Sequence, residues 1–189
     1  MKKSHVFDPR HIEALESKER TAWQNPEEII PILNLKPSYI AADLGCGTGY
    51  FTIPLSRKVK KVYGIDVQNE MLAFLDQKIQ KQKIRNIETI LAKENKIPLP
   101  DESINFLLTV NTLHEFHDRD AILKEIIRVI TTQGQVAVID FKKENMSFGP
   151  PNSIRVSKEK SIRLFEKQGL TVLDSHTLRY HYLIVFGKK

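Results

Sequence analysis

The sequence predicts an α/β fold built on a doubly wound, mostly parallel sheet, and three observations support this prediction. Apolar, β-branched runs of strand length alternate with amphipathic segments of helical spacing along most of the chain. The first run leads into a glycine-rich turn that a helical segment follows at once. The last two runs lie so close in sequence that they must pair antiparallel, because a parallel partner needs a crossover of about a dozen residues. We therefore expect seven strands, one of them reversed.

Length and composition indicate one domain. The chain has 189 residues, 41% of them hydrophobic and 28% charged, which suffices for one well-packed core. We expect a single domain over residues 1–189, with cap helices in 1–36 and the sheet in 37–189. A single cysteine, Cys46, excludes an internal disulfide and a multi-thiolate metal site. No segment reaches membrane-spanning length and no apolar leader follows the first residues, so we expect a cytoplasmic protein.

The formal net charge of +6 raises the question of a nucleic-acid partner. Lysines such as Lys78, Lys81 and Lys83 are spread over a predicted helix surface and do not form a separate basic segment. A basic isoelectric point is only the first of several signs of a nucleic-acid binder. We interpret the excess as solvated surface charge and do not expect a nucleic-acid partner.

Two helix-start signals precede the first strand. Asp8-Pro9 offers an N-cap followed by proline at the first helical position, which predicts a helix within His5 to Ser17. Asn25-Pro26 repeats this signal and predicts a second helix. We expect both helices to cover the open end of the sheet, where Arg20 and Trp23 could line a substrate pocket, although packing is the commoner role of a tryptophan.

The first strand ends in a turn whose glycines are spaced two apart, within Ile40 to Thr52. Gly45, Gly47 and Gly49 lack a Cβ, so the backbone can adopt positive φ and a ligand can approach the main chain. The spacing differs from the G-x-G-x-x-G of dinucleotide binders, and Asp43 precedes it. A carboxylate at this position suits a ligand that presents an ammonium group.

A second acidic residue ends the next predicted strand. Lys61 to Val67 is a β-branched run that contains Asp66. In a strand-helix-strand unit this carboxylate lies beside the glycine turn, where it can accept hydrogen bonds from both hydroxyls of a ribose. The sequence therefore predicts a ribose-containing ligand at the turn.

Strands and helices alternate beyond this unit. Ile104 to Val110 is a nearly continuous apolar run, which is typical of a central strand buried on both faces. The other expected strands are Ile87 to Ala92, Gly134 to Phe141, Leu170 to Leu178 and Tyr180 to Phe186, and the expected helices are Tyr50 to Arg57, Gln68 to Lys83, Asp118 to Ile130 and Ser157 to Gly169.

Polar residues follow the central strand, in Asn111 to His117. Ligands of open α/β sheets bind outside the carboxyl ends of the strands, so this loop should face the site. His114 is the best placed candidate for a general base, because imidazole titrates near neutral pH. A loop histidine bonded to nearby backbone is the alternative. His114 and His117 lack the i, i+4 spacing of a zinc-binding helix, so we expect no metal.

A long loop, about residues 142–156, follows the fifth strand and contains Gly149-Pro150-Pro151. Long loops of this kind are often lids. We expect it to close over an acceptor, with Pro150 in the pocket. Lys142, Lys143 and Arg155 could make the mouth of that pocket cationic, which would suit an anionic or phenolate small molecule, with solvated surface charge as the alternative.

The motifs Asp43-x-Gly45-x-Gly47-x-Gly49 and Tyr63-x-Ile65-Asp66 together resemble the first two motifs of class I S-adenosylmethionine (SAM)-dependent methyltransferases. The resemblance covers nearly all of the chain and is closest to the small, stand-alone type 11 group, which includes quinone and arsenite methyltransferases. It implies a Rossmann-like fold and SAM as the cofactor. The cofactor-binding residues that it implies are Asp43, Gly45, Gly47, Gly49, Asp66, Val67, Glu94 and Asn111. Lys93 stands where the family has an acidic adenine-binding residue, and Glu94 is its nearest replacement.

The resemblance implies an enzyme that transfers a methyl group from SAM to a small molecule and releases S-adenosylhomocysteine. The expected substrate-pocket residues are Arg20, Trp23, His114, His117 and Pro150. An RNA or protein methyltransferase is one alternative, but Asn111-Thr112-Leu113-His114 departs from the Asp/Asn-Pro-Pro-Tyr/Phe motif of enzymes that methylate nucleic-acid amino groups. A non-catalytic Rossmann-type binder of a nucleotide such as NAD is the other. The sequence predicts neither the acceptor nor the oligomeric state.

Overall fold

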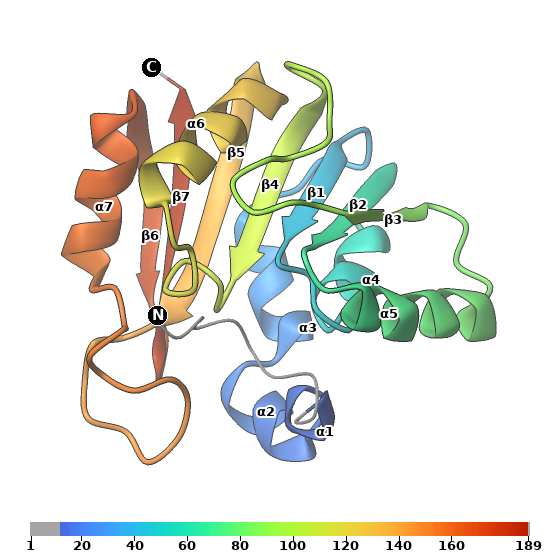
Figure 1. Ribbon diagram of the computed structural model, residues 1–189, viewed down its shortest axis with the longest axis horizontal. Helices are drawn as coiled ribbons and strands as arrows, with labels where there is room; N and C mark the ends of the chain where they lie inside the picture. The colour runs from blue at the N-terminus through green and yellow to red at the C-terminus, as the bar shows by residue number, and fades with distance from the viewer. Residues whose placement is uncertain (1–11, 189) are drawn as a thin grey trace.

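A seven-stranded sheet in the order β3-β2-β1-β4-β5-β7-β6 runs through the computed structural model, which describes residues 12–188 (Figure 1). Strands β1 to β5 are parallel to one another, and β7 is antiparallel to both β5 and β6. The expected doubly wound sheet with one reversed strand is confirmed. The strands are β1 (Ile40–Leu44), β2 (Lys61–Asp66), β3 (Ile87–Leu91), β4 (Ile104–Val110), β5 (Ile130–Phe141), β6 (Leu170–Thr177) and β7 (His181–Lys188).

Helices cover both faces of the sheet because its strands bury alternate residues on opposite sides. On one face Ala42 and Leu107 belong to a core that includes residues of the later helices, and on the other Ala41 and Leu108 pack in a core with residues near the glycine turn. The helices beyond the cap are α4 (Thr52–Ser56), α5 (Asn69–Gln82), α6 (Arg119–Val129) and α7 (Lys158–Lys167). Each lies within the helix expected from the sequence. Among residues 12–188, no helix has both the length and the apolar character needed to span a membrane.

The cap consists of short helices and differs from the expected pair. Its elements are α1 (Ile12–Leu15), α2 (Lys18–Trp23), α3 (Pro26–Ile29) and the 3₁₀ helix η2 (Ile30–Leu33). The expected start at Asp8-Pro9 lies outside the described residues. Helix α1 lies within the expected range of His5 to Ser17 and ends at Leu15. The Ser17 side chain accepts a hydrogen bond from the Arg20 amide and is the N-cap of α2, a helix that was not expected. The start at Asn25-Pro26 is confirmed, with the Asn25 side chain as the N-cap.

Strand β5 begins earlier than expected. The sequence predicts its start at Gly134, but the strand starts at Ile130, directly after α6, and Ile130 pairs with Ile104 of β4. An irregularity in the register between Ile104 and Phe106 accommodates the additional residues. The carboxyl end of β5 is where it was expected, so the edge that carries the site does not change.

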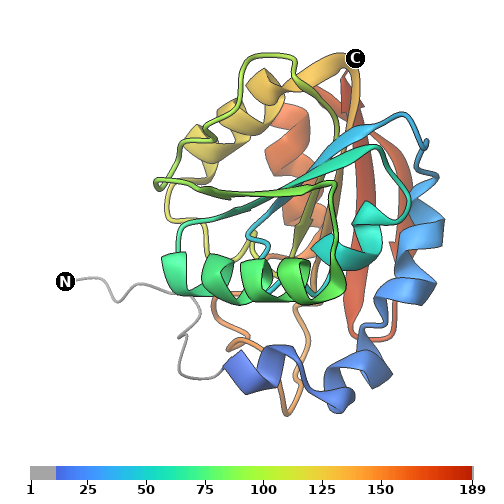
Figure 2. The same ribbon diagram turned by 90° about the vertical axis from the view of Figure 1, so that its right-hand side faces the viewer.

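The carboxyl ends of β1, β4 and β5 meet at one edge of the sheet, the lower edge in Figure 1. Helices α1 and α2 lie below this edge, and the loop of residues 142–157 hangs from it beside them. Figure 2 shows the same arrangement after a rotation of 90°, with the loop and the cap again close together. Ligand sites of open α/β sheets occupy this position, next to the point where the strand order reverses.

Candidate active site

A cavity of about 1310 Å³ opens at this edge. The glycine turn, the ends of β2 and β4, helix α2 and the loop after β5 all contribute to its lining. The structure therefore brings together most of the residues singled out from the sequence, which are Arg20, Trp23, Gly45, Gly47, Asp66, Val67, Glu94, Asn111, His114, His117 and Pro150. These residues come from segments that are far apart in the chain.

The glycine turn presents its backbone to the cavity. Gly45 and Gly47 adopt φ of 75° and 51°, the left-handed region that favours glycine. A Cβ on Gly45 would lie 2.5 Å from Thr112, whereas a Cβ on Gly47 would meet only the Leu15 side chain, at 3.8 Å. The main chain at Gly47 is therefore open to a ligand.

Asp66 closes the other side of the turn. Its Oδ2 accepts a hydrogen bond from the Gly47 amide at 2.8 Å, and its Oδ1 accepts one from the Gln68 amide at 3.0 Å. Partial burial raises the pKa of Asp66, and the backbone amides lower it in part. A carboxylate has about four lone-pair sites, so both oxygens can still accept hydroxyl groups from a ligand in the cavity.

Two residues expected to contact the cofactor, Asp43 and Gly49, lie outside the cavity lining, and their contact with the cofactor stays a prediction. Asp43 is buried on the face of β1 that points toward α4, where it accepts a hydrogen bond from Thr52 Oγ1 at 2.6 Å. Burial raises its pKa to about 7. A Cβ on Gly49 would collide with Leu75 of α5. Asp43 and Gly49 therefore support the turn from behind, because their position in the strand and turn directs them toward the helices.

The end of the cavity nearest β2 and β3 combines apolar and charged side chains. Val67 is 43% exposed and lines the cavity, an exposure that leaves apolar surface for a ligand ring. Lys93 and Glu94 both line the same end. The structure thus places Glu94 where an adenine contact was expected, and that contact stays a prediction.

A hydrogen-bond network that the sequence did not predict joins the cap to the sheet. Gln24 is buried, and its side-chain amide exchanges hydrogen bonds of 2.9 and 3.2 Å with that of Asn111 at the end of β4. Arg20 donates to Gln24 Oε1 and to the Leu15 carbonyl, and its guanidinium lies 4.1 Å from the Tyr50 ring centroid. Burial lowers the pKa of Arg20 to about 10. This network fixes α2 over the cavity.

Aromatic rings form the opposite end of the cavity. The Trp23 ring lies 5.1 Å from Phe148 and 5.8 Å from Phe141, measured between centroids. All three residues belong to the lining. Trp23 therefore has both roles considered for it, because it packs against the other two rings and also lines the pocket. Phe141 and Phe148 were not predicted, because an aromatic residue at a strand end or in a loop carries no distinct sequence signal.

His114 forms a buried pair with Asp140 at the end of β5. His114 Nδ1 lies 2.9 Å from Asp140 Oδ1, and the His114 amide donates to Oδ2 at 3.2 Å. Since an ionised carboxylate only accepts hydrogen bonds, Nδ1 carries the proton and Nε2 keeps its lone pair in the neutral ring. Burial by itself lowers the pKa of His114, but the hydrogen bond and charge of Asp140 outweigh it and raise the pKa above 6.5. The sequence predicted His114 but not Asp140.

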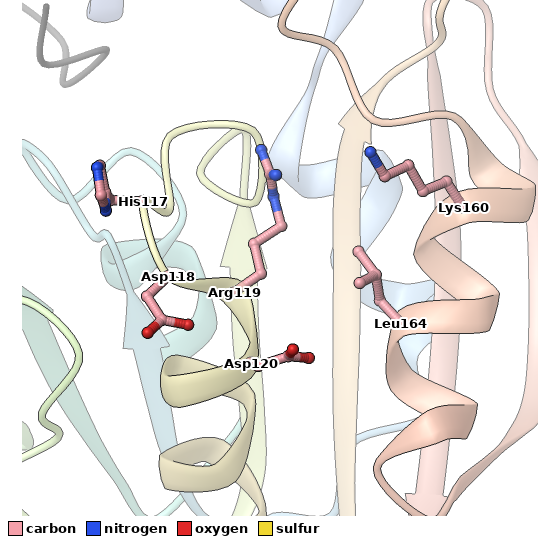
Figure 3. A pocket seen from close by; sticks show the side chains of 6 residues that line it. All are labelled: His117, Asp118, Arg119, Asp120, Lys160 and Leu164. Atoms are coloured by element: carbon pink, nitrogen blue, oxygen red, sulfur yellow. The ribbon is translucent and has the colours of Figure 1, made fainter. Parts of the chain in front are cut away.

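Arg119 holds in place the loop that contains His114. Arg119 Nε donates to the Leu113 carbonyl and Nη2 to the His114 carbonyl, both at 3.1 Å. Arg119 also lines a smaller groove of about 410 Å³ between α6 and α7. Figure 3 shows Arg119 and Lys160 extending toward the same end of this groove, with Asp118 and Asp120 pointing elsewhere. His117 lines both the groove and the main cavity.

No group of three His, Cys, Asp or Glu residues within the described range is placed to hold a metal ion. His114 has its Nδ1 committed to Asp140, and Cys46 is buried in the glycine turn. Burial raises the pKa of the Cys46 thiol.

A second buried histidine packs against the aromatic wall, the name used here for the rings of Trp23, Phe141 and Phe148. His181 stacks on Trp23 at 5.4 Å and contacts Phe141 at 4.3 Å between centroids. Neither ring nitrogen has a hydrogen-bond partner within residues 12–188. Burial, together with the positive charges of Arg20 and Arg155, lowers the pKa of His181 to about 3, so the ring is neutral at physiological pH.

The replacement His181→Phe should remove a pH-dependent cost to stability. Between pH 6.5 and about 3 the unfolded chain binds a proton at this position that the folded chain does not bind. This group therefore lowers the free energy of unfolding by about 1.4 kcal/mol per unit of acidification. In urea unfolding at several pH values, the free energy of unfolding of the variant relative to that of the parent should increase as pH falls. Parallel curves for parent and variant would contradict the assignment of a neutral, buried imidazole.

Comparison with known proteins gives consistent matches. A family model described as "Methyltransferase domain" matches residues 42–138. A SAM-dependent methyltransferase from Aquifex aeolicus has a crystal structure that superposes with a TM-score of 0.90, at 32% identity, and the match covers 96% of this chain and 98% of that one. Demethylmenaquinone methyltransferases from Bacillus mycoides and Geobacillus are 30% and 28% identical over 128 and 145 residues, which are 66% and 72% of this chain.

The fold and the site define a class I SAM-dependent methyltransferase, an enzyme whose cofactor is SAM. Within this class, the chain belongs to the methyltransferase-domain family of type 11. The chain spans only 53% and 61% of the length of the two demethylmenaquinone methyltransferases. The family and the cofactor are therefore shown, whereas the acceptor has to be argued from the site.

Proposed function

We propose that this enzyme methylates a small, planar aromatic compound that carries an ionisable hydroxyl group, such as a hydroquinone. The observation that carries the proposal is the His114–Asp140 pair, because His114 lines the same cavity as the aromatic rings of Trp23, Phe141 and Phe148. Ring surfaces of this kind stack on flat apolar ligands. The names of the Bacillus mycoides and Geobacillus relatives, which act on demethylmenaquinone, favour the same class.

The residues around the glycine turn suit SAM. The open main chain at Gly47 would receive the amino-acid end, the Asp66 carboxylate the ribose hydroxyls, and Val67 the adenine ring. When bound, SAM supplies a methyl group on a sulfonium that is already a good leaving group. The protein then has to orient the acceptor, exclude water and handle one proton.

His114 is suited to that proton transfer. Its Nε2 would accept the proton of the acceptor hydroxyl, which makes the acceptor electron-rich and leaves an imidazolium beside Asp140. Asp140 holds the ring orientation and stabilises the positive charge, because it is fully buried and bonded to Nδ1. With the acceptor bound, the rings of Trp23, Phe141 and Phe148 would exclude water from the reacting groups.

The test uses SAM and 1,4-dihydroxynaphthalene under reducing conditions without oxygen, with naphthalene as the acceptor that lacks hydroxyl groups. We expect S-adenosylhomocysteine and a singly methylated product by mass spectrometry from the dihydroxy compound only. Failure with a panel of mono- and dihydroxyarenes would contradict the proposed acceptor class. A location in the cytoplasm and an acceptor other than nucleic acid are part of the same proposal; the loop Asn111 to His114, which lacks the nucleic-acid amino-methylation motif, supports the second.

The replacement Asp66→Ala should weaken SAM binding about ten- to a hundredfold, because two ribose hydroxyls lose a charged partner worth about 1.5 to 3 kcal/mol. Asp66→Asn should lose less, since an amide keeps one accepting oxygen. Asp76→Ala is the control: this α5 carboxylate accepts a hydrogen bond from Thr89, away from the cavity. Isothermal titration calorimetry measures all three. Equal affinities for Asp66→Ala and the parent would remove Asp66 from the cofactor site.

A further inference from the structure

A buried arginine organises the loop that forms one side of the acceptor end. Arg155 is 3% exposed, and its guanidinium donates to four main-chain carbonyls. The acceptors are the carbonyl groups of Pro150 and Glu144 at 2.8 Å, Phe148 at 2.9 Å and Lys142 at 3.3 Å. A guanidinium presents its N–H groups in a rigid planar fork, so these four carbonyls are held in fixed relative positions.

This arrangement corrects the expectation that Arg155 gives the pocket a cationic mouth. Arg155 does not belong to the cavity lining, and its donors point into the loop. Its guanidinium carbon lies 5.3 Å from the Phe141 ring centroid. The charged guanidinium of Arg155 therefore binds the backbone carbonyls of its own loop.

The carbonyls that Arg155 binds belong to residues that shape the cavity. Phe148 and Pro150 line it, and the Phe148 ring packs against Trp23 of the cap at 5.1 Å. Between them, Gly149 approaches Phe141 so closely that a Cβ would lie 2.7 Å from the ring. Any shift of this segment would therefore change the distance between the loop, β5 and α2.

We propose that Arg155 is a positioning residue that sets the width of the acceptor end of the cavity by fixing the loop of residues 142–150 against Trp23. The identity of the acceptor rests on the proposed function, but the position of the loop does not. The lid motion expected from the sequence stays a prediction; with four carbonyls tied to one side chain, the loop would have to move as a unit.

The test compares Arg155→Met, which keeps volume without donors, with Arg155→Lys, which keeps the charge but not the fork. Arg163→Met on the exposed side of α7 is the control. Trp23 is the only tryptophan of the chain, so its fluorescence reports directly on the wall. In Arg155→Met, we expect Trp23 emission at longer wavelength and faster cleavage by a glutamyl endopeptidase after Glu144. Arg155→Lys should show smaller changes in the same direction.

A third measurement addresses the acceptor. Titration of 1,4-dihydroxynaphthalene into the complex with S-adenosylhomocysteine, followed by quenching of Trp23, should give a dissociation constant about ten- to a hundredfold higher in Arg155→Met. The SAM affinity should match that of the parent. Reduced SAM affinity in parallel with acceptor affinity would indicate general damage to the fold and overturn the positioning role.

The outcomes separate the two proposals. Unchanged emission and cleavage in both Arg155 variants, as in Arg163→Met, would overturn the role of Arg155. Changed emission and cleavage, in a protein whose parent form does not bind the dihydroxynaphthalene, would support the role of Arg155 and contradict the proposed acceptor. If Arg155→Met does not fold, Arg155→Lys decides between these results, because a lysine at this position can still be buried against carbonyls.

Discussion

We expect the replacement Gly47→Val to abolish SAM binding in a protein that remains folded. Gly47 has φ of 51°, and the space beyond its missing Cβ is open to the cavity. A valine side chain would fill the position that the ligand needs and would resist positive φ because it is β-branched. Overpacking of this kind costs about 3 kcal/mol, so affinity should fall by about a hundredfold or more.

A matched control separates loss of the binding surface from backbone strain. Gly169 also has positive φ, of 87°, but within residues 12–188 no atom beyond its chain neighbours lies within 4 Å of a Cβ built there, and it is outside the cavity lining. Gly169→Val should therefore lower the free energy of unfolding by about 1 to 3 kcal/mol through backbone strain, as Gly47→Val should, but keep full SAM affinity. Circular dichroism measures the fold and equilibrium dialysis the binding. SAM binding by Gly47→Val at parental affinity would show that the turn does not hold the cofactor.

The replacement His114→Gln should lower the turnover number by about a hundred- to ten-thousandfold, the range for loss of a positioned general base. SAM affinity should be unchanged, because the His114 side chain is not among the expected cofactor contacts. The control is His176→Gln: His176 Nε2 lies 2.9 Å from Asp174 Oδ2 in an exposed pair on β6, outside the cavity lining. Steady-state kinetics with a confirmed acceptor measures both variants.

The pH dependence gives a second test of His114. The base form exists only above its pKa, which Asp140 raises above 6.5, so kcat/KM should rise with pH through a pKa higher than that of an ordinary histidine. In Asp140→Asn the raising charge is lost, and the acidic limb should move to lower pH. A profile that is the same in parent and Asp140→Asn would show that His114 is not the titrating base.

Local patterns were sufficient for the main elements of the fold. The alternation of β-branched runs with amphipathic segments predicted the strands and crossover helices, because a strand or helix needs a periodic apolar face of its own to be buried. The cap was the exception: a helix of four residues such as α1 has too few positions for periodicity, and the N-cap Ser17 gave the only local signal for α2.

The candidate site divides in the same way. Gly47 and Asp66 were found because a positive-φ turn and a strand end have residue requirements that are visible in a short segment. His114 was found as a polar residue after a buried strand. Its partner Asp140 lies 26 residues away and was missed, since the pairing of β4 with β5 decides whether the two side chains meet.

The sequence by itself determined the fold class, the glycine turn, the acidic residue beside it and, through the family resemblance that these motifs carry, the cofactor. Each depends on the backbone conformation or burial of a few consecutive residues. Only the tertiary structure decided that Asp43 supports the turn from behind, that Gln24 joins the cap to Asn111, and that Arg155 binds its own loop. The physical reason is that side chains on a strand alternate between faces and long polar side chains bond wherever packing brings donors and acceptors together, so their direction depends on residues distant in the chain.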